Sequence, residues 1–74
     1  MQKGKVKWFD SKKGYGFILN PQEGEDIFVH YSSIVSDNDY KMLSQGMEVD
    51  FDMEITEKGL QAKNVREIVT FLWT

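Results

Sequence analysis

Two short segments of the chain alternate between aliphatic and aromatic positions with a period of two, which is typical of β-strands. The segments span residues 13–18 and 26–31. Within each segment the aliphatic positions fall on one face, with Ile18 in the first segment and Ile27 and Val29 in the second. The aromatic and polar positions fall on the opposite face, with Tyr15 and Phe17 in the first segment and Asp26, Phe28 and His30 in the second. A chain of 74 residues with no strongly helical segment has little material to cover both faces of a sheet, so we expect the aliphatic face to be the core.

A further strand is predicted over residues 4–9, with Val6 directed inward and Lys5 and Lys7 directed outward. Trp8 has the parity of Val6, so a regular strand would point its ring inward. A bulged or strongly twisted strand would instead bring the ring to the edge of the aromatic face. The orientation of Trp8 therefore depends on whether this strand is regular.

The clearest strand pattern covers residues 47–56, where apolar and mostly acidic positions alternate. The apolar positions, which we expect to be buried, are Met47, Val49, Phe51, Met53 and Ile55. After a turn at 57–59, the apolar positions of a fifth strand, Leu60 to about Ile68, change parity between Ala62 and Val65, which predicts a β-bulge.

Residues 32–45 lack periodicity and predict a long connection, in which 40–43 can form one helical turn with Leu43 packed inward. Five short strands with one long connection between the third and the fourth favour an all-β fold. We expect a five-stranded antiparallel Greek-key barrel of the OB-fold class, because closure of the barrel removes exposed strand edges.

Composition limits the cellular setting and the chemistry. The length allows one domain, and the absence of cysteine excludes disulfides, thiolate zinc sites and a cysteine nucleophile. No secretory leader and no apolar run of roughly 18 residues is visible, so we expect a cytoplasmic protein without a membrane partner. His30 is the single histidine, and no constellation for hydrolysis or group transfer is present. We therefore expect no metal, no cofactor and no small-molecule substrate. We also expect no enzymatic activity.

The charge of the chain is unevenly distributed. The formal net charge is -3, but residues 1–20 carry five lysines and one aspartate, a local charge of +4. Residues 21–57 carry ten acids and one lysine, a local charge of -9. The basic segment, residues 1–20, thus also contains the aromatic residues Trp8, Tyr15 and Phe17. Exposed rings with cations nearby suit unstacked nucleobases and their phosphates, which predicts binding of single-stranded nucleic acid.

Three ordered motifs closely resemble the bacterial cold-shock proteins: Lys5-Val6-Lys7-Trp8-Phe9, Lys13-Gly14-Tyr15-Gly16-Phe17-Ile18 and Asp26-Ile27-Phe28-Val29-His30-Tyr31-Ser32-Ser33-Ile34. The resemblance continues through residues 40–43, Gly46 and residues 59–65. It predicts a cold-shock domain over residues 1–68. It implies a barrel that binds single-stranded RNA and DNA and acts as an ATP-independent RNA chaperone.

Carried over by position, the resemblance implies a nucleic-acid site in which aromatic residues stack on bases, lysines serve the backbone, and polar residues contact base edges. The stacking residues would be Trp8, Tyr15, Phe17, Phe28, His30, Tyr31 and Tyr40, with Phe9 in the same motif but in an ambiguous orientation. The lysines would be Lys7, Lys13 and Lys58. The base-edge residues would be Asp26 and Gln61, with Asp10 at a position where the family typically has asparagine.

Other positions also depart from the family pattern. Leu60 replaces a common proline, Asp39 stands where glycine often precedes the aromatic residue at 40, and Tyr15 and Tyr31 stand where phenylalanine is usual. Residues 69–74 form an apolar tail that the family does not normally carry. Three hypotheses are open for this tail: disorder, packing along the barrel edge, and self-association. We expect a monomer, and a dimer through the tail is the alternative.

A second function class is open on the sequence alone. Tryptophan and tyrosine also suit protein interfaces, so the aromatic face could belong to an OB-fold interaction module that docks a protein partner or a sugar. Competition by short oligonucleotides would separate this hypothesis from nucleic-acid binding.

Overall fold

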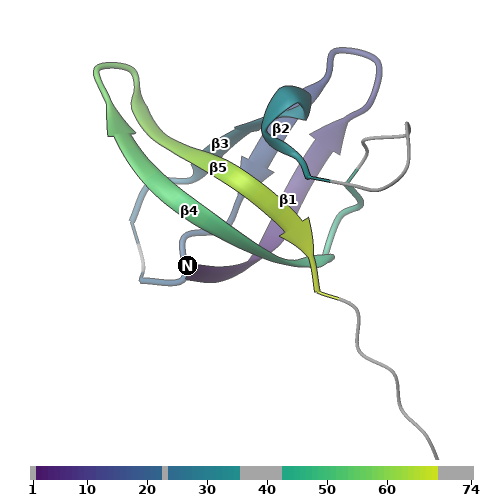
Figure 1. Cartoon of the computed structure of the whole chain (residues 1–74), viewed down its shortest axis with the longest axis horizontal. Coiled ribbons are helices and arrows are strands. Elements are labelled where there is room, and N and C mark those ends of the chain that lie inside the picture. Colours follow the sequence, from purple (N-terminus) through teal and green to yellow (C-terminus); the bar gives the residue numbers. More distant parts are fainter. Residues whose placement is uncertain (1, 23, 36–42, 69–74) are drawn as a thin grey trace, which may run out of the picture.

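The computed structural model describes residues 2–22, 24–35 and 43–68, which form five strands and one short 3₁₀ helix. The strands are β1 (Gln2–Asp10), β2 (Tyr15–Ile18), β3 (Ile27–His30), β4 (Glu48–Thr56) and β5 (Gly59–Glu67), and the helix η1 (Tyr31–Ser33) follows β3. The strands close into a barrel in the order β1-β2-β3-β5-β4 (Figure 1). The predicted all-β, five-stranded barrel is confirmed. Among the described residues, no helix is long and apolar enough to cross a membrane.

Four of the five strand pairs in the described barrel are antiparallel, and β3 pairs with β5 in parallel. An antiparallel neighbour reverses the strand direction, and five reversals around a ring cannot return to the starting direction. A closed barrel with an odd number of strands therefore needs a parallel pair. The sequence-based prediction of an antiparallel barrel did not include this pair, which places Phe28 of β3 opposite Gln61 of β5.

A β-bulge in β1 decides the orientation of Trp8. Val6 lies opposite Ile18 of β2, but Trp8 lies opposite Phe17, so β1 contains one more residue than β2 over this interval. Only 1% of Val6 is exposed, against 39% of Trp8. The inserted residue, Lys7, reverses the parity of the strand. The bulged alternative for this strand is thus confirmed.

The bulge predicted in β5 is also present. Asp50 of β4 pairs with Arg66 and Asp52 pairs with Lys63, so two residues of β5 oppose one residue of β4. Asn64 takes the left-handed conformation there, with a φ of 52°, which asparagine tolerates better than most residues. The bulge allows Ala62 and Val65 to be buried although they differ in parity.

The interior contains the aliphatic face predicted from the sequence. Its buried residues are Val6, Ile18, Ile27, Val29, Ile34, Leu43, Val49, Phe51, Ala62 and Val65. Leu43 packs inward as predicted, and Met47 and Met53 are half-buried against this core. The prediction is wrong for Ile55, which is 80% exposed. Ile55 pairs with Leu60 next to the β4–β5 turn, where the hairpin extends beyond the neighbouring strands (Figure 1).

The contrast between Ile18 and Ile55 predicts a large difference in the free energy of unfolding. Ile18→Ala removes fully buried atoms and leaves a cavity, so we expect a loss of about 2–5 kcal/mol. Ile55→Ala removes atoms that are mostly in water, so we expect a change within about 0.5 kcal/mol. Urea unfolding of both variants measures the two values. Equal losses would contradict the exposed position of Ile55.

Candidate nucleic-acid interface

Four aromatic side chains from three adjacent strands are in mutual contact on the outer surface of the barrel. They are Trp8 of β1, Tyr15 and Phe17 of β2, and Phe28 of β3, and we refer to them as the aromatic face. The ring centroid of Trp8 lies 5.8 Å from that of Tyr15 and 5.3 Å from that of Phe17. Phe28 lies 5.7 Å from Tyr15 and 5.8 Å from Phe17. The sequence-based grouping of these residues is confirmed.

The strand register explains this grouping. Phe17 lies directly opposite Phe28, and the β1 bulge brings Trp8 opposite Phe17 on the other side. Ile18 and Val29 alternate with these rings and are fully buried, so they support the aromatic face from below. The rings themselves are only partly buried. Each ring therefore keeps part of its π-surface in water, where an unstacked base can reach it.

Gly16 lets β1 and β2 approach closely beneath the rings. A Cβ atom at this position would overlap the carbonyl oxygen of Trp8 and lie 2.6 Å from the Cα atom of Phe9. Both obstacles are backbone atoms, so a side chain could be accommodated only by separating the strands. The glycine between Tyr15 and Phe17 is thus a structural requirement for placing Trp8 against both rings.

His30 and Tyr31 form a second aromatic pair beside the aromatic face, with ring centroids 4.5 Å apart. The backbone N–H of Ser32 donates to His30 Nδ1 at 3.3 Å, and Ser32 Oγ lies 2.8 Å from the same nitrogen. These two contacts with Ser32 hold the imidazole ring in its orientation. Tyr31 is 49% exposed, and its N–H donates to the Gly14 carbonyl oxygen at 2.8 Å. His30 is the strand partner of Tyr15, so the pair of rings adjoins the aromatic face through His30.

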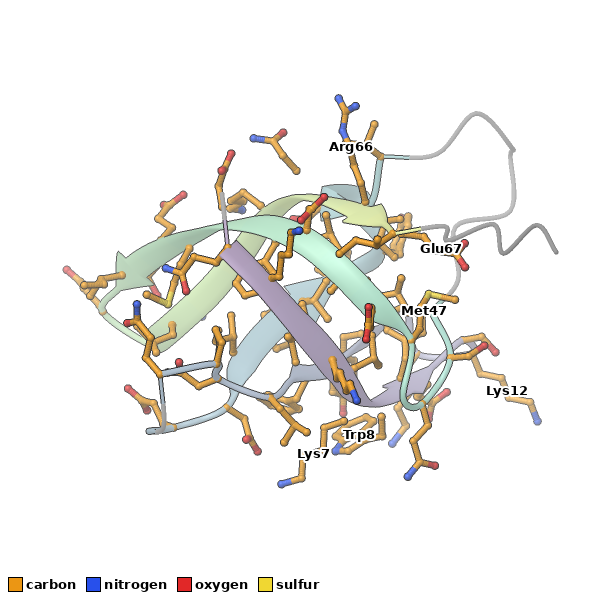
Figure 2. The ribbon with its side chains drawn as sticks, turned by 90° about the horizontal axis from the view of Figure 1, so that it is seen from below. Lys7, Trp8, Lys12, Met47, Arg66 and Glu67 are labelled. Carbon is orange, nitrogen blue, oxygen red and sulfur yellow. The ribbon has the colours of Figure 1, made fainter. Side chains whose placement is uncertain are left out.

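Lys7 and Asp26 form an ion pair at one edge of the site. Lys7 Nζ donates to Asp26 Oδ2 at 2.8 Å, with 49% of the lysine and 33% of the aspartate side chain exposed. The two residues are 19 positions apart in the sequence, and the β1 bulge contributes one of them. The lysine expected at the phosphates and the aspartate expected at a base edge are therefore bound to each other. Figure 2 shows Lys7 and Trp8 projecting from the same edge of the barrel.

Asp10 and Lys13 lie at the turn between β1 and β2. Asp10 Oδ1 accepts the backbone N–H of Lys12 at 2.9 Å and that of Lys13 at 3.1 Å. The carboxylate thus closes the turn, which Gly14 completes with a φ of 79°. The side chains of Lys12 and Lys13 are exposed.

The remaining predicted residues differ in where they lie relative to the aromatic face. Gln61 is brought beside Phe28 by the β3–β5 pairing, whereas Lys58 lies in the β4–β5 turn with its N–H donating to Thr56 Oγ1. Phe9 is half-buried and packs against the core, so its ambiguous orientation is resolved inward. Tyr40 lies outside the described residues, as do Asp39 and the tail at 69–74.

Two contributors were missed by reasoning from the sequence. Ser32 orients the imidazole of His30, and its place two residues after the histidine is a signal that could have been used. Gly16 permits the close strand approach, and an isolated glycine within a strand pattern is a known sign of such an approach. Among the described residues, no group of three or more histidine, cysteine or acidic side chains could hold a metal ion.

A closed five-stranded barrel with contacting rings exposed on its outer surface has the architecture of a nucleic-acid-binding protein of the OB-fold class. The family model described as "'Cold-shock' DNA-binding domain" matches residues 2–68, and the chain belongs to this family. The match includes all strands of the barrel and ends where the apolar tail begins.

Two relatives agree with this assignment, and a solved structure shows the same fold. The chain is 52% identical over 62 residues to the cold shock-like protein CspG of Shewanella violacea, covering 84% of this chain and 87% of that protein. It is 48% identical over 67 residues to the cold shock protein CspC of Bacillus subtilis, covering 90% and 98% of the two chains. A structure titled "drosophila Unr CSD456" has the same fold, with a TM-score of 0.74 and 20% identity. The alignment covers 92% of this chain and 26% of that longer chain.

Proposed function

We propose that this protein binds single-stranded RNA and DNA by stacking bases on the aromatic face, and that it acts in the cytoplasm as an ATP-independent RNA chaperone. The observation that carries the proposal is the contact of four rings from three strands on the outer surface. His30 and Tyr31 extend the stacking surface, and Gln61 supplies a hydrogen-bonding group beside Phe28. We propose no catalytic step. Assays for nuclease activity and for a metal requirement of binding, both with a negative result expected, test that part.

Selectivity for single strands follows from the use of base faces. A duplex stacks these faces on one another, so they are available only when the strand is open. Stacking on an aromatic side chain contributes about 1–3 kcal/mol per base, so four bases contribute about 4–12 kcal/mol before the cost of ordering the strand. That range corresponds to micromolar to nanomolar binding. A ligand of this affinity shifts RNA toward its open form by mass action, which is the proposed chaperone activity.

The experiment that tests the function is a fluorescence titration with a short oligothymidine, in a Trp73→Phe background so that Trp8 reports. Saturable quenching, with much weaker binding of a duplex of the same length, is the expected result. No binding at low salt by the folded protein would contradict the proposal. Binding of a protein or sugar partner at the same rings, without competition by oligonucleotides, would favour the interaction-module alternative.

The salt dependence of binding should be shallow. Stacking is proposed to dominate the affinity, and Lys7, which projects beside Trp8, is already bound to Asp26. We therefore expect a slope of log affinity against log salt that corresponds to about two to four phosphate contacts, at roughly 0.7 per contact for single strands. Titrations at several salt concentrations measure it. A slope corresponding to about eight contacts would mean that charge, and not stacking, dominates the affinity.

Removal of the Asp26 charge should make the salt dependence steeper. In Asp26→Asn the ammonium group of Lys7 loses its ionic partner and becomes available to a phosphate, so we expect about one additional phosphate contact in the slope. The matched variant Lys7→Gln should leave the slope near that of the unmodified protein. In the unmodified protein Lys7 is already bound to Asp26, so its removal takes away no phosphate contact. An unchanged slope in Asp26→Asn would show that the ion pair does not restrain Lys7.

We propose that the protein acts as a monomer, since the aromatic face and its neighbours belong to one chain. A dimer through residues 69–74 is the alternative. Sedimentation of the full chain and of a chain without these residues separates the two, because a tail-dependent dimer would lose half its mass on truncation.

A further inference from the structure

We infer that Asp10 makes this protein prefer guanine over thymine or uracil for the base that stacks beside Tyr15 and Trp8. The inference deepens the proposed function and rests on it. It concerns which base is read at one position of the bound strand.

Asp10 lies on the outer side of the barrel, at the edge of the aromatic face. It is the last residue of β1 and the strand partner of Tyr15. Phe9 packs against the core, and in a strand the residues on either side of an inward residue point outward, so Trp8 and Asp10 share the outer side. A base stacked on Tyr15 therefore has an edge next to this carboxylate.

The carboxylate is held in place and keeps acceptor capacity. Oδ1 accepts the N–H groups of Lys12 and Lys13, which restricts the rotamer of the side chain. Among the described residues, Asp10 Oδ2 makes no hydrogen bond and Asp10 forms no ion pair. Asp26, the other carboxylate at the edge of the site, differs because its Oδ2 accepts from Lys7. The two carboxylates therefore present different chemistry to a base, because Asp26 is paired with a cation and Asp10 is not paired with one among the described residues.

The acceptor-only character of an ionised carboxylate decides which base edge fits. Guanine presents two adjacent donors, N1–H and the N2 amino group, on its Watson–Crick edge, which is open in a single strand. Thymine and uracil present one N–H between two carbonyl oxygens, and these oxygens repel the carboxylate. Adenine and cytosine present an amino group beside a bare ring nitrogen, which is also an acceptor. Guanine is thus the one base whose edge offers two neighbouring donors to Asp10.

The test measures the ratio of the affinity for an oligonucleotide with guanine at one position to the affinity for the oligothymidine. General effects of charge change both affinities alike and cancel in this ratio. Each position of a seven-nucleotide oligothymidine is replaced in turn by dG, and binding is measured by fluorescence in the Trp73→Phe background. We expect one position at which guanine is preferred over thymine by about tenfold, the size of a good base-edge contact. Inosine, which lacks the N2 amino group, should lose a large part of that preference at the same position.

Asp10→Asn identifies the residue responsible. The amide oxygen can still accept the turn hydrogen bonds, so the fold should be kept, while the new amide N–H₂ can donate to the carbonyl oxygens of thymine. We expect the guanine-to-thymine ratio at the sensitive position to fall about tenfold, to near one. Glu67→Gln, which removes the same charge on β5 apart from Trp8 in Figure 2, should leave the ratio unchanged.

Two results would overturn the inference while leaving the proposed function intact. One is oligothymidine binding with no position that prefers guanine beyond the general advantage of a purine. The other is a guanine-to-thymine ratio that Asp10→Asn does not change. Failure of the unmodified protein to bind any of the oligonucleotides would instead overturn the proposed function, and the inference with it.

Discussion

Replacement of Phe17 or Phe28 by alanine is expected to weaken the binding of a short oligothymidine by about tenfold or more while the barrel remains folded. Phe17 contacts Trp8 and Phe28, and Phe28 contacts Tyr15 and Phe17, so these two rings occupy the centre of the aromatic face. Removing either ring deletes one stacking surface and opens a gap between its neighbours. The loss of one base stack, about 1–3 kcal/mol, corresponds to about 5- to 150-fold in affinity.

The fold should survive these changes because neither phenylalanine belongs to the buried core. A cross-strand aromatic pair contributes only roughly 0.2–1 kcal/mol to a sheet, so a modest decrease in stability is expected. Circular dichroism and thermal melting of each variant verify that the barrel is intact before binding is measured. The matched control is Ile55→Ala, which also truncates an exposed apolar side chain but lies at the β4–β5 turn.

Full affinity in both alanine variants, with Ile55→Ala also unchanged, would contradict base stacking on the aromatic face. Weakened binding in all three variants would point to a general loss of structure and would not support the site. Weakened binding in the phenylalanine variants alone is the result that the geometry predicts.

Gly16→Ala is expected to destabilise the barrel by about 3 kcal/mol or more, which is a large part of the stability of a domain of this size. The added methyl group would overlap the backbone of Trp8 and Phe9, and the Cδ1 atom of the Phe9 ring would also lie 2.9 Å away. Because strand backbones cannot move aside without breaking the β1–β2 pairing, the clash is relieved only by opening the barrel. Thermal melting should show a decrease of about 4–8 °C per kcal/mol.

Gly46→Ala provides the matched control for this prediction. Gly46 has a φ of 83°, which alanine adopts only with strain, but no atom of the described residues lies within 4 Å of an added Cβ. We expect a loss of about 1–2 kcal/mol from backbone strain alone. A smaller loss in Gly16→Ala than in Gly46→Ala would contradict the close approach of β1 and β2.

Much of the site could be predicted because it depends on local alternation. The parity of residues 15–18 and 26–30 separates rings from aliphatic residues within each strand, whatever the rest of the chain does. The outward position of Phe17 and Phe28 and the burial of Ile18, Ile27 and Val29 follow from it. The strand pattern predicted the fold class, and the resemblance to the cold-shock family added the family and the roles of individual residues; the family match confirms the family.

Other features required the three-dimensional pairing of distant segments. Trp8 had two possible orientations because a bulge changes parity without changing the sequence pattern, and only the register with β2 shows where the extra residue lies. Ile55 continued a regular alternation, yet burial also requires a packed neighbour, and among the described residues β1 pairs with β4 only over residues 48–51. Local periodicity says which side a residue faces, but not whether anything covers that side.

The chain by itself determined the number of strands, the division between core and aromatic face, and the family. The tertiary structure alone decided the ion pair of Lys7 with Asp26 and the parallel contact that sets Gln61 beside Phe28. The physical reason is the range of the interactions. Side-chain alternation is a property of consecutive residues, whereas register, closure and ion pairing depend on which distant residues are brought together when the barrel closes.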